Sequence, residues 1–324
     1  MNPAHHPRPA ALALLSLVLF LTTVPGLARA APPPEPDRQE AGGRGRKAPS
    51  STEGAVSRPR AGRQEVGSAS LPPGMAAQNS GPAPGKKAAA LPTADFVILE
   101  SSDGEPARVV AGNPALADRP FCPASTFKIA LAWVALEHGV VASSTRLACH
   151  DPYLGTGTFA LDLHQALLYS SNAFFQETAP RAGRPAIEEF LSRSGYATTH
   201  ALAGWLGRDW TPVVKGGRLR ITPRQQQAFL ERLATGRLPD PAGVRDTLVE
   251  ALRWPSPDPA VALFGKTGTH DGAVWFAGFG RTGASQRIVT VFCRGTVARR
   301  PAVIAAFYAR FGLAWSDTLL PPLR

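Results

Sequence analysis

Cysteine is scarce in this sequence, where Cys122, Cys149 and Cys293 are the only three among 324 residues. Their spacings match no zinc-binding pattern, and the histidines are scattered without a Cys–His cluster. We therefore expect no metal site. In a compartment that permits disulfides, the three thiols allow one bridge and one free cysteine, and Cys122 with Cys149 is the best pair.

Large apolar side chains are almost missing from residues 31–92, which are rich in Ala, Pro, Gly, Ser and Arg. Such a segment cannot bury enough apolar surface to offset the entropy lost on ordering. We expect a disordered linker here. Residues 93–324 have the mixed composition of an ordinary globular domain and are long enough for a sizeable core.

A stripe of basic residues interleaved with aromatics is also absent from the region after Pro92. The formal net charge is +11, but part of it lies in the first 92 residues and the rest is spread over a large domain. Nucleic-acid binding requires a concentrated positive surface. We therefore expect no nucleic-acid partner.

The first 30 residues have the features of a secretory signal peptide. Arg8 precedes an apolar stretch over residues 11–24, and Ala28-Arg29-Ala30 fits the small-x-small cleavage pattern. The stretch is short for a membrane span, which needs about 20 residues. We expect a secreted or periplasmic protein that would touch a membrane only through this leader, if the leader stays uncleaved as an anchor.

The domain begins and ends with strand patterns and has helical patterns between them. This order predicts an α+β fold in which a central antiparallel sheet is built from both ends of the domain, flanked by helices, with a helical lobe inserted between. The expected strands cover residues 95–100, 107–111, 262–269, 273–280 and 287–293. The expected helices cover residues 123–138, 161–168, 173–178, 185–194, 222–233, 243–253 and 301–313.

A Ser-x-x-Lys motif, Ser125 to Lys128, stands at the start of the first predicted helix. Residues i and i+3 share one helix face, so the two side chains can meet. A serine hydroxyl is a weak nucleophile without a base, and a lysine can act as that base once burial or a neighbouring cation lowers its pKa. We expect Ser125 as the nucleophile and Lys128 as its general base.

Two further motifs complete the candidate site. Ser170-Ser171-Asn172 interrupts two predicted helices, where the Ser170 hydroxyl can relay a proton and the Asn172 amide can bind a substrate or Lys128. The second motif ends a predicted strand, and it offers a cation, two hydroxyl groups and a glycine that permits close approach. Its residues are Lys266, Thr267, Gly268 and Thr269.

The three motifs occur in the order found in serine β-lactamases and penicillin-binding proteins. The chain resembles class D β-lactamases and the related penicillin-binding transpeptidases and β-lactam sensors over residues 95–313. The resemblance rests on the segments 123–128 (PASTFK), 169–177, 216–223 and 265–279 (GKTGTHDGAVWFAGF). It implies an acyl-enzyme on Ser125 and an oxyanion hole formed by the N–H groups of Ser125 and Thr269. It also implies Arg300, with Arg299 as the competing choice, for the substrate carboxylate.

Some positions depart from the class D pattern. Those enzymes usually have a hydrophobic residue where this chain has Asn172, and a tryptophan where it has Val213 or Val214. Their lysine is N-carboxylated by carbon dioxide and then activates water. Asn172 disfavours this state of Lys128, so no cofactor is expected. Glu188 and Glu189, on an expected solvent-facing helix, offer no other activation of water.

These observations predict a class D-like serine β-lactamase that hydrolyses β-lactam antibiotics through an acyl-enzyme at Ser125. The Ser-x-Asn motif keeps a first alternative open, a penicillin-binding D,D-transpeptidase or carboxypeptidase acting on peptidoglycan stem peptides. A second alternative is a non-hydrolytic β-lactam sensor or binding domain. Under each reading the partner is a small β-lactam or a stem peptide.

Overall fold

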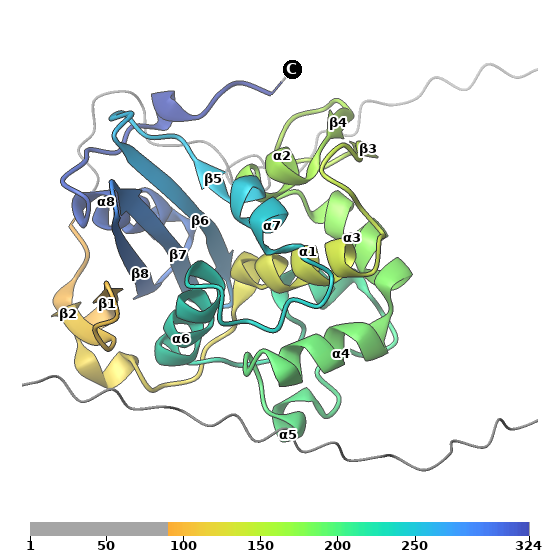
Figure 1. Ribbon diagram of the computed structural model, residues 1–324, viewed down its shortest axis with the longest axis horizontal. Helices are drawn as coiled ribbons and strands as arrows, with labels where there is room; N and C mark the ends of the chain where they lie inside the picture. Colours follow the sequence, from red (N-terminus) through yellow and green to blue (C-terminus); the bar gives the residue numbers. More distant parts are fainter. Residues whose placement is uncertain (1–89, 324) are drawn as a thin grey trace, which may run out of the picture. The chain divides into compact units, whose positions relative to one another are not determined.

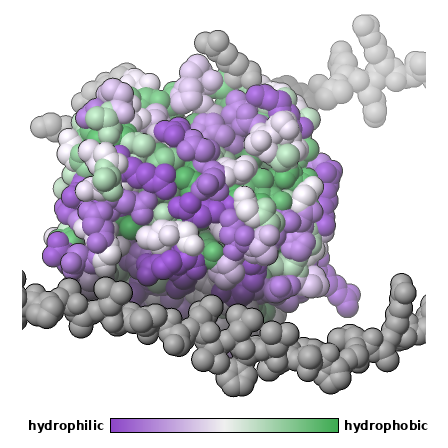
Figure 2. Space-filling model, viewed as in Figure 1, coloured by the Kyte–Doolittle hydropathy of each residue, from purple (hydrophilic) through white to green (hydrophobic). Residues whose placement is uncertain are grey.

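The computed structural model describes residues 90–323. The predicted leader over residues 1–30 and nearly all of the predicted linker over residues 31–92 lie outside the described residues, so these boundaries stay predictions. Between residues 90 and 323, no helix is both long enough and apolar enough to cross a membrane. Figure 2 shows hydrophilic residues over much of the visible face, with smaller hydrophobic areas between them.

A six-stranded sheet in the order β2-β1-β8-β7-β6-β5 forms the centre of the fold, and all of its neighbouring strands are antiparallel (Figure 1). The pairing of β1 with β8 joins the start of the domain to its end, as the order of strand patterns predicts. The strands are β1 (Phe96–Ser102), β2 (Arg108–Gly112), β5 (Arg253–Trp254), β6 (Val261–His270), β7 (Ala273–Thr282) and β8 (Ser285–Arg294).

Helices cover both faces of the sheet. On one face α8 (Arg300–Ala309) packs its Phe307 ring against Phe276 of β7, with ring centroids 4.0 Å apart. On the other face α6 (Pro223–Ala234) contacts β8 and β1. Along a strand, alternate side chains point to opposite faces of the sheet. Because helices cover both faces, the apolar residues of β7 and β8 are buried on either side.

The helical lobe is inserted between β2 and β5, and α1 (Lys128–Glu137) runs through its centre. Every residue from Lys128 to Leu136 is buried, because α3, α4 and α7 surround the helix. The other helices are α2 (Leu163–Leu168), α3 (Asn172–Ala182), α4 (Arg184–Arg193), α5 (Thr199–Leu202) and α7 (Arg245–Ala251). The predicted α+β architecture is confirmed.

Local signals in the sequence account for several of these boundaries. Thr222 begins α6 with a capping box, in which its side chain accepts from the Gln225 N–H and the Gln225 side chain reaches back. Gly139 follows α1 with φ +65°, as a helix-ending glycine does. A small hairpin of β3 (Leu147–Cys149) and β4 (Phe159–Leu161) was not predicted, because its strands have only three residues each.

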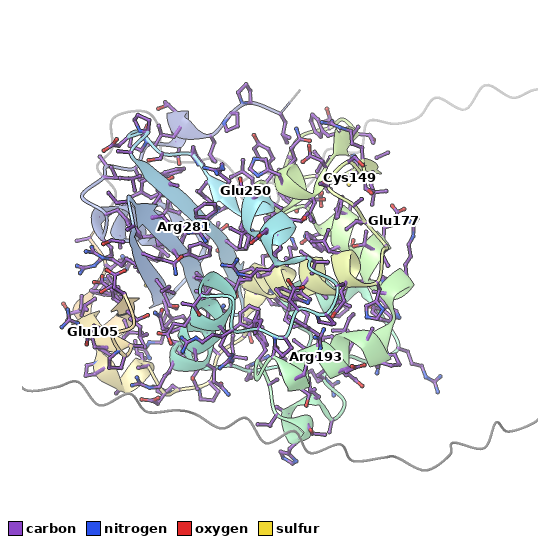
Figure 3. All side chains as sticks on the ribbon, in the orientation of Figure 1. Glu105, Cys149, Glu177, Arg193, Glu250 and Arg281 are labelled. Carbon is purple, nitrogen blue, oxygen red and sulfur yellow. The ribbon has the colours of Figure 1, made fainter. Side chains whose placement is uncertain are left out.

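The predicted Cys122–Cys149 disulfide is wrong, because all three cysteines are buried free thiols. Cys122 packs with apolar residues of β1 and β7, and its Sγ lies 3.4 Å from both the Ala124 nitrogen and the Lys215 carbonyl oxygen. Cys149 lies on β3 in the helical part of the molecule (Figure 3). The two thiols therefore belong to different hydrophobic clusters, which spacing along the chain does not reveal.

Candidate active site

Ser125 lies in a 3₁₀ turn, Ala124–Phe127, that leads directly into α1. The turn begins with Ala124 in the left-handed region at φ +50°, a conformation that a residue with a side chain adopts only when its surroundings enforce it. Ser125 lines a cleft of about 400 Å³ between β6 and the helical lobe. The nucleophile candidate is thus held on a fixed turn and faces open space.

Lys128 begins α1 and is fully buried. Its Nζ donates to the Ser170 carbonyl oxygen at 2.5 Å and to Asn172 Oδ1 at 2.8 Å, and it lies 3.3 Å from Ser170 Oγ. Burial lowers the pKa of Lys128 to about 7, and the cations of Lys215 and Arg300 act in the same direction while Asp151 opposes them. The lysine is therefore poised to accept a proton near neutral pH.

Ser125 Oγ makes no hydrogen bond to Lys128 within residues 90–323, since the amine is engaged by Ser170 and Asn172. Catalytic hydrogen bonds are often long in a free enzyme and tighten when substrate binds. The structure therefore brings Ser125 and Lys128 to one site. In it, Lys128 bonds to Ser170 and Asn172 instead of to Ser125.

The Ser170–Asn172 turn is held by a segment that carries no recognisable motif in the sequence. The buried Asp151 carboxylate accepts from the Asn172 N–H at 2.8 Å and from Ser171 Oγ at 2.5 Å. The Tyr153 hydroxyl accepts from the Asn172 N–H at 2.9 Å and donates to the Ser170 carbonyl oxygen at 2.7 Å. Ser170 itself has φ +63°, so these bonds hold a strained backbone that presents the Ser170 side chain to Lys128.

Strand β6 forms one wall of the cleft and carries the third motif. Thr267, Gly268 and Thr269 line the cleft, whereas Lys266 is fully buried beneath it and donates to the Thr267 carbonyl oxygen at 3.0 Å. Burial, together with the charges of Lys128 and Arg300, lowers the pKa of Lys266 well below its usual value. Lys128, Lys266 and Arg300 thus disfavour one another's charge at this cleft, and an anionic ligand would favour the protonated form of each.

Gly268 is the point where β6 touches the nucleophile turn. A Cβ on this residue would lie 3.0 Å from the Thr126 N, 3.1 Å from the Ser125 N and 3.1 Å from the Pro123 carbonyl oxygen. Only glycine allows this approach. It places the backbone of β6 beside the Ser125 N–H, as a paired oxyanion hole requires.

Of the two candidate arginines, Arg300 lines the cleft and its Nη2 lies 3.2 Å from Thr267 Oγ1. Arg299 instead packs its side chain beside Gly295. Glu188 differs from the expectation, because it is half-buried and accepts from the Trp205 Nε1 at 2.8 Å rather than facing solvent. It does not line the cleft.

Comparisons with known proteins agree with this geometry. Residues 96–247 match the family model of the penicillin-binding protein transpeptidase domain. The chain is 26% identical to β-lactamase OXA-5 and 27% identical to OXA-10, both of Pseudomonas aeruginosa, over 57% of this chain and 69% and 70% of those proteins.

Solved structures of class D β-lactamases superpose on most of the described residues. The Nostoc enzyme YbXI is 26% identical with a TM-score of 0.57, and the alignment covers 67% of this chain and 94% of that one. The Bacillus subtilis enzyme is 21% identical with a TM-score of 0.58 and covers 68% and 93%. At 21% identity, the similarity to the Bacillus subtilis enzyme supports only the fold.

Proposed function

The chain belongs to the family that unites class D β-lactamases with penicillin-binding transpeptidases, and we propose that it is a serine enzyme that opens β-lactams through an acyl-enzyme at Ser125. The observation that carries the proposal is the pairing of a cleft-lining Ser125 with a buried Lys128 whose pKa is lowered to about 7. A neutral lysine can take the serine proton, and serine then attacks.

In the acylation step the Ser125 Oγ forms a bond to the β-lactam carbonyl carbon, and its proton passes to Lys128. The ring C–N bond breaks, and the departing nitrogen receives a proton from Lys128 through the Ser170 hydroxyl, 3.3 Å from Nζ. The N–H groups of Ser125 and Thr269 stabilise the negative charge that develops on the carbonyl oxygen.

The substrate carboxylate binds at Arg300 and the Thr267 hydroxyl, which both line the cleft, with Arg300 Nη2 3.2 Å from Thr267 Oγ1. Lys266 is fully buried beneath them and donates a hydrogen bond to the Thr267 carbonyl oxygen at 3.0 Å. This arrangement suits both a β-lactam carboxylate and the C-terminal carboxylate of a stem peptide, so it does not by itself distinguish the two substrates.

Deacylation depends on the state of Lys128. A carboxylated lysine needs hydrogen-bond donors for its two oxygens, but the amine here faces two acceptors, the Ser170 carbonyl oxygen and Asn172 Oδ1. By the resemblance, Val213 or Val214, both buried, takes the position where class D enzymes usually have a tryptophan. The residues present do not fit a carbamate, and we propose that Lys128 remains an amine and that β-lactam hydrolysis is slow.

The Asn172–Lys128 contact favours a second candidate function, a D,D-transpeptidase or carboxypeptidase that acts on peptidoglycan stem peptides. Such an enzyme forms the same acyl-enzyme with β-lactams and is inhibited by its slow release. The predicted leader supports a place outside the cytoplasm, in the periplasm or beyond, for either function.

Intact-mass measurement after penicillin treatment tests the shared step. We expect one adduct of penicillin mass on the wild type and none on Ser125→Ala. Hydrolysis of a chromogenic cephalosporin then separates the candidates, since steady turnover favours the β-lactamase. Release of D-alanine from a stem peptide favours the peptidase, and labelling without either activity favours a sensor. The absence of both an adduct and hydrolysis with folded wild-type protein would overturn the proposal.

A further inference from the structure

Lysine is rare in residues 90–323, and its distribution is uneven. The only lysines there are Lys128, Lys215 and Lys266, while arginine supplies the other cationic side chains apart from histidine. Two of them are the motif lysines at the floor of the site. The third, Lys215, lines the same cleft as Ser125, although it belongs to neither motif.

The backbone of Lys215 is fixed beside the nucleophile turn. Its carbonyl oxygen lies 3.4 Å from Cys122 Sγ, three residues before Ser125. The next residue, Gly216, has φ +84° and packs on Pro123 so closely that a Cβ would lie 2.6 Å from the proline ring. These contacts hold Lys215 at the edge of the cleft by the packing of two turns rather than by its own side chain.

The Lys215 ammonium has no ion pair with residues 90–323. Asp271 is an acid that lines the same cleft, but its Oδ2 already accepts from Arg220 Nη2 at 2.8 Å. The charge of Lys215 lowers the pKa of both Lys128 and His270. A half-buried cation without a partner is costly unless a ligand or solvent compensates it.

The two cations reach the cleft from different segments of the chain. Lys215 ends the 3₁₀ turn Thr211–Lys215, whereas Arg300 begins α8 and bonds to Thr267 of β6. Both side chains line the cleft that Ser125 also lines. A substrate acylated at Ser125 would therefore lie in a cleft with two separate cations in its lining.

We propose that Lys215 forms a second anion subsite, which binds a carboxylate on the acyl side chain of the substrate while Arg300 binds the carboxylate on its leaving side. The inference rests on the proposed function, since it assumes acylation at Ser125. The chemical class that it names is an acyl donor with two carboxylates, either a β-lactam with an acidic side chain or a peptide whose acyl-donating residue carries a second carboxylate.

A matched pair of penicillins tests the subsite. Benzylpenicillin and carbenicillin differ by one carboxylate on the side-chain carbon next to the phenyl ring. The second-order rate of acylation of Ser125 is measured for each by intact mass, and the ratio of carbenicillin to benzylpenicillin is compared among variants. Any effect of Lys215 on Lys128 acts on both penicillins and cancels in this ratio.

We expect Lys215→Met to lower the ratio about fivefold, which is the contribution of a partly exposed ion pair. Lys215→Arg should keep the wild-type ratio. Arg218→Met, the matched control, removes an exposed cation from the same loop that does not line the cleft, and its ratio should also stay at the wild-type value. In wild-type protein the ratio should fall as sodium chloride is raised, because salt screens the pair.

The outcomes separate the two proposals. Labelling by both penicillins with the same ratio in wild type and Lys215→Met would overturn the second subsite and leave the acyl-enzyme intact. A ratio in the wild type that does not respond to salt would also count against the subsite, and this measurement needs no variant. Absence of both labelling and hydrolysis with either penicillin would instead overturn the proposed function.

Discussion

Asn172 Oδ1 accepts a hydrogen bond from Lys128 Nζ at 2.8 Å, so the amide engages the group that is expected to act as the general base. The bond favours an amine or ammonium over any form of the side chain that itself needs donors. It also holds the lysine toward the Ser170 turn rather than toward Ser125. The fate of an acyl-enzyme in this protein therefore depends on residue 172 as much as on the Ser-x-x-Lys pair.

Replacing the amide should change turnover. Asn172→Val removes the acceptor beside Lys128 and makes the pocket more apolar, which lowers the cost of N-carboxylation. We expect hydrolysis of a chromogenic cephalosporin to rise about tenfold in the presence of bicarbonate, equivalent to ~1.4 kcal/mol in the barrier. Asn172→Asp, of nearly the same size, is the control and should not gain activity. Fast, bicarbonate-stimulated turnover by the wild type would contradict the role assigned to Asn172.

Acylation should depend on pH through Lys128. Only the neutral amine accepts the Ser125 proton, and burial lowers the pKa of this lysine to about 7. The neutral fraction therefore increases as the pH rises through 7, and the acylation rate should rise with it and level off about one unit higher. The check is the rate of penicillin labelling by intact mass across that range. A rate that stays flat between about pH 6 and 8 would exclude Lys128 as the titrating base.

Asp151 should also affect how the acylation rate depends on pH. Its buried carboxylate raises the pKa of Lys128, so Asp151→Asn, which keeps the side-chain size, should move the midpoint of the acylation profile to lower pH. The variant also weakens the bonds to the Asn172 N–H and Ser171, and we expect the plateau rate to fall about tenfold, as losses at charged acceptors commonly do. A slower plateau with an unmoved midpoint would assign Asp151 a structural role only.

The motifs predicted much of the site because each one is local in sequence. Ser125 and Lys128 are one helical turn apart, and residues 266–269 are consecutive on β6, so spacing alone indicates which side chains share a face. The same reasoning predicted the sheet, since the strand patterns of β6, β7 and β8 are long and apolar. These elements also have strong glycine-containing turns between them.

Contacts between distant segments could not be predicted in this way. Asp151 and Tyr153 reach Asn172 from a segment between two three-residue strands, which gives no periodic signal. Lys215 lies at the cleft next to Gly216, which packs on Pro123, a residue nearly a hundred positions earlier in the chain. The cysteine pairing failed for the same reason, since sequence separation does not give spatial distance.

The approach of Gly268 to the nucleophile turn leads to a prediction about both stability and acylation. A methyl group at this position would lie within 3.1 Å of the Ser125 N and of the Pro123 carbonyl oxygen, which belong to backbone that cannot move aside easily. Gly268→Ala should therefore push β6 away from the turn, and overpacking of this kind costs about 1–3 kcal/mol. The Thr269 N–H would move with the strand, so the proposed oxyanion hole would widen.

We expect Gly268→Ala to acylate at least about a hundredfold more slowly with penicillin, as loss of an oxyanion donor does. The unfolding free energy, measured by urea denaturation, should fall by the smaller amount that overpacking predicts. Gly207→Ala is the matched control, because a methyl group on this exposed glycine would meet no atom within 4 Å and its backbone is not left-handed. It should change neither quantity. Normal acylation by a folded Gly268→Ala protein would show that β6 and the Ser125 turn do not form the oxyanion hole together.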